Sequence, residues 1–248
     1  MIHCTYAWGE KKYFIRGFFM HNEHGHDHIH GEQHSIVSEL FCHLPYAIYS
    51  VAFSLIILSF FSVFTMGTTD PLVIKKGCKA LFHSFHFMHI VFAATGTIIT
   101  FCRFSKNYIR ALIVGVISPT VFCILSDAVL PYIGGIILGV SMKFHMCFII
   151  EPHRVIPFLI VGIINGFVMS MHHGSKQGGY SLSSHAIHIF MSSLAATFYL
   201  ISHGFTQWYS SIGSVFVLLI IAVVVPCTLA DVVVPMTMAR VGKKCKKA

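Results

Sequence analysis

Long apolar runs constrain the fold of this chain more than any other feature of its sequence. A helix that crosses a bilayer needs roughly 20 mostly apolar residues. Charged residues make up only 10% of the chain, against about 25% in ordinary globular proteins. So little charge cannot give a water-facing surface to so apolar a chain, and we predict an all-α, polytopic integral membrane bundle. Six runs qualify as spans: 45–66, 84–102, 109–130, 155–171, 186–203 and 212–234.

A seventh apolar segment, 132–150, leaves the number of spans between six and seven. It contains Gly134, Gly135, Lys143 and His145, which are compatible with a re-entrant segment. With six spans, 12 Lys and Arg residues lie on one side of the membrane and 5 on the other, which favours both termini in the cytoplasm. Six spans would, however, leave the segment 132–150 outside the membrane, although it is apolar and almost long enough to cross the bilayer. On this ground we expect about seven spans.

Two parts of the sequence are similar enough to predict an internal duplication. A His-x-x-His pair opens two of the apolar runs, at residues 86–89 and 185–188. In each case the next long run ends in the pattern C-x-L-x-D-x-V-x-P, at residues 123–131 and 227–235. We therefore expect two three-helix repeats, an architecture common in transporters, with the site at the repeat interface.

The duplication divides the chain into five parts. We expect an N-terminal polar segment, a first membrane repeat, a linker helix or re-entrant segment, a second membrane repeat and a basic C-terminal tail: 1–44, 45–131, 132–154, 155–235 and 236–248. Seven spans would make the repeats parallel. Six spans would invert them and place one histidine set near each membrane face.

Each repeat is expected to bring two imidazoles and one carboxylate together. Residues three or four apart share a helix face, and consecutive helices form a hairpin, so the start of one lies level with the end of the next. We predict a membrane metal site with histidine ligands and aspartate anchors: His86, His89, Asp127, His185, His188 and Asp231. The alternative interpretation of D-x-V-x-P is a helix end, with the proline stopping the span.

The segment 21–34 is a second candidate metal site. It contains six histidines and three acidic residues, a composition typical of metal binding. Its predicted ligands are His21, His24, His26, His28, His30 and His34. Such donors suit zinc, manganese, iron, nickel or cobalt without distinguishing among them. The segment is similar to the histidine-rich loops of the ZIP and cation-diffusion-facilitator families, whose HNxxD and HxxxD membrane motifs this chain lacks.

The eight cysteines are scattered, with no CxxC motif. We interpret most of them as small buried side chains rather than as disulfide partners.

These features favour a transporter or permease for divalent transition-metal ions, in the plasma or inner membrane, rather than an enzyme. The segment 21–34 would collect or unload ions, and Asp127→Asn or Asp231→Asn would abolish transport. The chain has no P-loop, so nucleotide-driven transport would need a separate energising subunit. The expected partners are the bilayer, metal ions and a second copy of the chain. Nucleic acid is not expected, because the basic clusters lack interleaved aromatic residues.

Two other functions stay open. A membrane oxidoreductase could bind haem through axial histidines near span ends, such as His86, His89, His188 and His203. A di-iron enzyme would instead use the histidines expected on one side of the membrane: His83, His86, His89, His172, His173, His185 and His188. Their spacing departs from the HxxxH and HxxHH boxes of membrane desaturases. A small-solute transporter or accessory subunit would use none of them. A three-one-three arrangement of spans resembles in outline the sugar-transporting SWEET type, although the PQ motif is absent.

Overall fold

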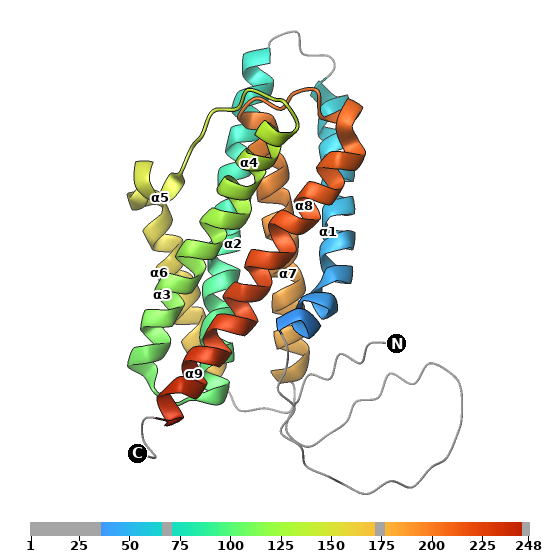
Figure 1. Cartoon of the computed structure of the whole chain (residues 1–248). Coiled ribbons are helices and arrows are strands. Elements are labelled where there is room, and N and C mark those ends of the chain that lie inside the picture. Colours follow the sequence, from blue (N-terminus) through green and yellow to red (C-terminus); the bar gives the residue numbers. More distant parts are fainter. Residues whose placement is uncertain (1–35, 66–70, 172–176, 245–248) are drawn as a thin grey trace, which may run out of the picture.

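The computed structural model describes residues 36–65, 71–171 and 177–244, and all regular structure in these residues is helical (Figure 1). In chain order the elements are α1 (Ile36–Thr65), α2 (Pro71–Phe104), α3 (Tyr108–Ile124), η1 (Leu125–Val129), α4 (Leu130–Ile137), α5 (Cys147–Ile150), α6 (Pro152–Met171), α7 (Gln177–Ser202), η2 (Trp208–Ser211), α8 (Ile212–Thr228), η3 (Leu229–Val233) and α9 (Val234–Lys244).

Among the described residues, six helical stretches are long and apolar enough to cross a membrane. They are His43–Thr65, Val73–Phe104, Tyr108–Ile137, Pro152–Met171, Ser184–Ser202 and Trp208–Val241. Each overlaps one of the six runs predicted from the sequence. The length and composition of these helices are consistent with a multi-pass helical membrane protein.

The segment 132–150 forms no spanning helix of its own. Its first residues, up to Ile137, extend the third span, because α3, η1 and α4 follow one another without interruption. The helix ends in a turn at Gly139, whose φ of 79° is a left-handed conformation that glycine adopts without strain. Irregular chain then leads to the short helix α5. The apolar side chains of Val140 and Met142 pack against the core. The described residues thus contain six helices long and apolar enough to cross a membrane, where we expected about seven.

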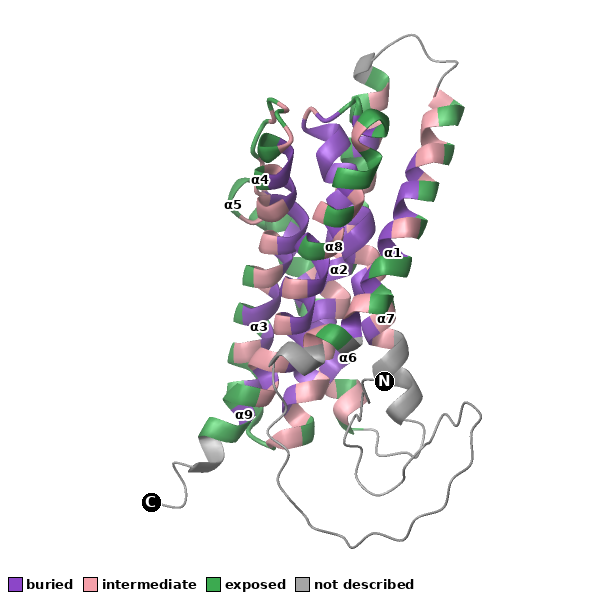
Figure 2. Cartoon of the chain, turned by 45° about the vertical axis from the view of Figure 1, so that its right-hand side comes forward, coloured by how far each residue is buried: buried purple, intermediate pink, exposed green. Residues whose placement is uncertain are grey.

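The helices α2 and α7 form the centre of the bundle. They pack against each other along their length and run in opposite directions (Figure 1). Of the six spans α7 is the most buried, and α6 and α1 are the least buried. The helix α1 covers α7 and α8, while α6 covers α2. Figure 2 shows the same order, with buried residues concentrated on the inner faces.

The outer faces of the bundle are apolar. Large side chains such as Phe64, Ile109 and Ile137 are 83%, 74% and 76% exposed. In water such a surface would favour aggregation, whereas in a bilayer it meets lipid tails.

Small residues bring α6 into close contact with α2. A Cβ atom at Gly162 would lie 2.6 Å from the backbone oxygen of Val91, so only glycine permits this approach. The Thr95 hydroxyl donates to the Gly162 carbonyl at 3.0 Å, and the Asn165 amide donates to the Thr95 hydroxyl at 3.2 Å. Asn165 therefore bonds to a neighbouring helix, as a polar residue inside a membrane span is expected to do.

The third and sixth spans each contain one π-helical turn, at η1 and η3. In both turns the backbone N–H that follows the turn donates to the carbonyl five residues earlier. Pro131 and Pro235 lie just beyond the two turns. Proline has no N–H and its ring clashes with the carbonyl four residues before it, and here the helix widens by one residue. Both helices continue past the proline, so the helix-stop interpretation of D-x-V-x-P is wrong.

Candidate metal centre

The first histidine pair and the first aspartate of the repeated pattern are in direct contact. His86 and His89 lie one turn apart on α2, and Asp127 lies in the π-turn η1. Oδ2 of Asp127 is 2.8 Å from Nδ1 of His86 and 2.6 Å from Nδ1 of His89. All three side chains are buried, with exposures of 2%, 1% and 0%. The grouping predicted from the sequence is observed.

The Asp127 carboxylate is fully satisfied. Its other oxygen, Oδ1, accepts the hydroxyls of Ser126 at 2.7 Å and Ser192 at 2.9 Å. Since Ser192 belongs to α7, this bond links Asp127 to the helix that carries the second histidine pair, His185 and His188. A buried carboxylate that accepts several such bonds is fixed in position.

Both imidazoles donate through Nδ1, so Nε2 of each ring carries the lone pair and acts as an acceptor. Nε2 of His89 lies 3.7 Å from Sγ of Cys123 and 3.8 Å from Sγ of Cys227. A metal-binding histidine usually donates the N–H of one ring nitrogen to a carboxylate and binds the ion through the other nitrogen. His89 has this arrangement, because Nδ1 donates to Asp127 and Nε2 faces two sulfur atoms.

The second histidine pair repeats this contact with the second aspartate. Nδ1 of His188 donates to Oδ2 of Asp231, and Nδ1 of His185 lies 3.4 Å from the same oxygen. His188 is fully buried, and His185 and Asp231 are 6% and 3% exposed. In this set three polar atoms have no hydrogen-bond partner among the described residues: Nε2 of His185, Nε2 of His188 and Oδ1 of Asp231.

The two sets meet inside the bundle. The rings of His89 and His188 lie 4.6 Å apart, centre to centre. Six spans were expected to leave one set near each membrane face, and the structure corrects this. The reason is that each histidine pair lies several turns inside its helix, so that two antiparallel helices overlap at the level of the pairs.

The close approach of α2 to the second aspartate depends on a glycine. A Cβ atom at Gly96 would lie 2.7 Å from Oδ2 of Asp231, so the carboxylate rests against the α2 backbone. The π-turn is anchored there as well. The Ala230 carbonyl lacks a helical partner because residue 235 is proline, and it accepts the hydroxyls of Thr97 and Ser118 at 3.1 Å each.

We call the place where the two His–His–Asp sets meet the central junction. Two groups of side chains there have the geometry to hold a metal ion. In each group the donor atoms lie within 4.8 Å of one another. One consists of His89, His188 and Cys227, and the other of His185, His188 and Asp231. His188 belongs to both groups and thus joins an N/S donor set to an N/O donor set.

Cysteine donors were not predicted from the sequence. Cys123 and Cys227 were interpreted as small buried side chains, and they are indeed free and buried. Their place in the repeated pattern, four residues before each aspartate, was the available signal, because it sets thiol and carboxylate on one helix face. Ser192 follows His188 by one turn, and no pattern pointed to it.

The remaining candidate residues lie elsewhere. The histidines of segment 21–34, together with His172 and His173, fall outside the described residues. The ring of His43 on α1 lies 4.2 Å from that of His185, edge to face. His203 stacks on Tyr199 at 4.1 Å and takes no part in the two groups.

The chain matches no known protein family, and comparisons with curated proteins and with solved structures also find no match. Its function is therefore inferred from the chemistry of its buried side chains.

Proposed function

We propose that the protein is a multi-pass transporter for divalent transition-metal ions. One observation carries this proposal: two His–His–Asp sets, buried within spanning helices, meet where His89 and His188 are 4.6 Å apart. Ionisable groups inside membrane spans are costly and characteristically mark ion pathways. The packing of apolar helices gives no reason for so many ionisable groups to gather at one place.

The unpartnered atoms support an ion at this place. A buried polar atom without a partner costs about 1–3 kcal/mol, and three such atoms gather on His185, His188 and Asp231. A cation bound by His89, His188 and Cys227 would satisfy Nε2 of His188, whose Nδ1 already donates to Asp231. The neighbouring Cys227 adds a soft donor, which favours zinc, iron, cobalt or nickel over magnesium and calcium.

We further infer that the chain is an inverted duplication, with α1 to α3 and α6 to α8 as its halves. Both halves place a π-turn with an aspartate next to a proline, and α2 and α7 run in opposite directions (Figure 1). Inverted repeats commonly bind their substrate at the junction and expose it to either side by rocking one half against the other. The junction of the two halves is where the two sets meet.

The alternative functions receive less support. A haem bound between two axial histidines needs a flat cavity between them, and the adjoining rings of His89 and His188 leave no such space. A di-iron centre would suit the donor types, so the test below includes a readout for bound iron. A small-solute transporter would leave the unpartnered imidazole and carboxylate atoms without a ligand.

The proposal is tested by reconstituting the full chain in liposomes loaded with a metal-sensitive dye. Zinc, manganese, iron(II), cobalt and nickel are offered in turn, and we expect saturable uptake of at least one ion. His188→Gln and Cys227→Ser should each reduce that uptake by tenfold or more, since each removes a donor from the junction. The matched variants are His153→Gln, an exposed position on α6, and Cys102→Ser, away from the junction, and both should transport normally.

Three outcomes would count against transport. Uptake of every ion could equal that of protein-free liposomes while the protein elutes as a single folded species. Uptake could also be unchanged in His188→Gln. Finally, stoichiometric iron that stays with the purified chain and is reducible would favour the oxidoreductase.

A further inference from the structure

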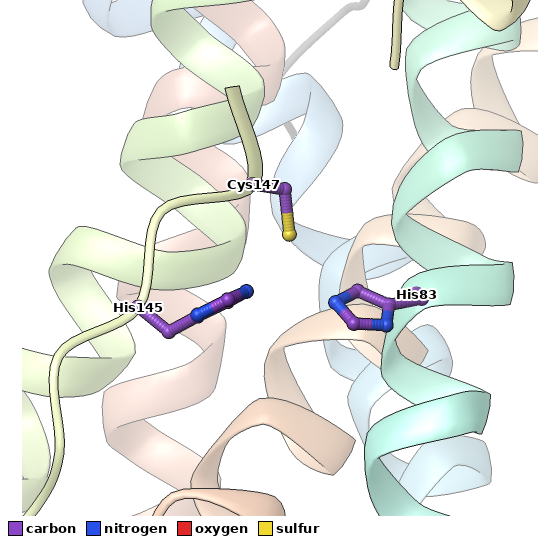
Figure 3. A group of neighbouring side chains, drawn as sticks. All are labelled: His83, His145 and Cys147. Atoms are coloured by element: carbon purple, nitrogen blue, oxygen red, sulfur yellow. The ribbon is translucent and has the colours of Figure 1, made fainter. Parts of the chain in front are cut away.

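A third group of metal-binding side chains lies outside the central junction. It consists of His83 on α2, His145 in the chain that follows α4, and Cys147, the first residue of α5. Their donor atoms lie within 4.8 Å of one another. Figure 3 shows the two imidazoles pointing toward each other and the Cys147 sulfur pointing into the space between them.

The local structure holds the three side chains in place. The backbone N–H of His145 donates to the Tyr199 hydroxyl at 3.2 Å, and its ring stacks on His203 at 5.6 Å. The ring of His83 stacks on that of Phe87 at 5.7 Å, with an angle of 8° between the planes. The irregular segment before α5 is therefore fixed against α7, and its histidine is directed toward α2.

The donor atoms of this group have no other use among the described residues. Nε2 of His83 and Nε2 of His145 are buried without a hydrogen-bond partner. Buried polar atoms in native proteins are nearly always paired, so two adjacent exceptions call for a ligand. Cys147 is 3% exposed and not in a disulfide, which leaves its sulfur available to the same ligand.

We propose that His83, His145 and Cys147 form a second metal site, which takes a borderline-soft divalent ion such as Zn²⁺ or Co²⁺. Two imidazoles and a thiolate are a common ligand set for such ions. On binding, the Cys147 thiol loses its proton to solvent and forms the metal–sulfur bond, while both imidazoles bind through lone pairs. No oxidant or reductant is needed.

The position of this site relates it to the central junction. His83 precedes His86 by three residues and His89 by six on α2, so three imidazoles follow this helix from the peripheral site toward the centre. The site lies toward the end of the bundle opposite the end where α1 begins and α9 ends (Figure 1). Binding of an ion there does not require that the protein transport it.

The test uses cobalt binding to the full chain in detergent. Cobalt bound by a thiolate gives a sulfur-to-metal charge-transfer band in the near ultraviolet, which ions held only by histidines do not give. We expect Cys147→Ser to remove a stoichiometric part of this band. His145→Asn should remove the same part, although it keeps every cysteine. Cys102→Ser is the matched control and should leave the band intact.

Further variants keep the test decisive. His145 is half-buried in a non-helical segment, so His145→Asn should fold even if Cys147→Ser does not. Asp127→Asn, which perturbs the central junction, should leave this part of the band unchanged, so that failure of the transport proposal is distinguishable from failure of this one. A full band in both His145→Asn and Cys147→Ser would overturn the peripheral site.

Discussion

Replacing Asp127 by asparagine tests the central junction most directly, because the substitution keeps the shape of the side chain and removes its charge. Oδ2 accepts from His86 at 2.8 Å and from His89 at 2.6 Å, and Oδ1 accepts from Ser126 and Ser192. An asparagine can offer its carbonyl to only one of these two pairs of donors. With the carbonyl toward the imidazoles, its NH₂ group faces the two hydroxyls, which must turn to accept.

The expected loss follows from these bonds. A hydrogen bond to a charged group contributes about 1.5–3 kcal/mol and a neutral one about 0.5–1.5 kcal/mol. Two imidazole bonds that change from charged to neutral therefore lose about 2–3 kcal/mol together. At about 1.4 kcal/mol for each factor of ten, this equals a loss of metal affinity of roughly 30- to 150-fold. Removing the carboxylate partner of a metal-binding histidine typically costs about 10- to 100-fold, and the two ranges overlap.

The assay is metal uptake by reconstituted liposomes, with the half-maximal ion concentration as the readout. Glu151→Gln is the matched control, because Glu151 is an acidic residue of the described segments that belongs to neither set. It should shift the half-maximal concentration less than twofold. Asp127→Asn with unchanged uptake and a folded elution profile would refute the positioning role. Complete loss, as predicted from the sequence, would instead show that Asp127 binds the ion itself.

Three further predictions concern other parts of the chain. Gly96→Ala should lower both metal affinity and thermal stability, because its Cβ would lie 2.7 Å from the Asp231 carboxylate, whereas Gly213→Ala, with nothing within 4 Å, should be neutral in a thermal-unfolding assay. Burial lowers the pKa of His203 from about 6.5 to about 4. The neutral imidazole therefore stabilises the fold above pH 6.5, and the free energy of unfolding should fall as the pH drops from 6.5 to 4. Thermal melts across this range should show a smaller fall in His203→Gln. Deleting 21–34 should raise the half-maximal ion concentration for uptake and leave the maximal rate intact, and an abolished maximal rate would contradict this.

The spans and the contact between each histidine pair and its aspartate were predictable from the sequence, because both depend on local order. Apolar runs of the right length identify spans, and a short loop sets the start of one helix level with the end of the next. Asp127 and His86 are 41 residues apart in sequence, but they lie on the two helices of one hairpin. Their contact needs no knowledge of the rest of the bundle.

The meeting of the two sets was not predictable, because it depends on how antiparallel helices pack. The depth of His89 relative to His188 follows from the close approach of α2 and α7, and Gly96 lets α2 lie against the second aspartate. The segment 132–150 shows the same limit. Its apolar character is real, but Gly139 ends the helix early, and Val140, Met142 and Phe148 pack on the core.

The two aspartates occupy equivalent places in the sequence pattern but are not equivalent in structure. Asp127 accepts bonds on both oxygens and has no capacity left for an ion. Asp231 has an unpartnered oxygen, and the imidazoles beside it have unpartnered Nε2 atoms. An ion bound by His89, His188 and Cys227 would face Nε2 of both imidazoles, because Nδ1 of each donates to an aspartate. On this interpretation both halves of the duplication supply ligands, and Asp127 stays hydrogen-bonded to His86, His89 and the two serines when the ion leaves.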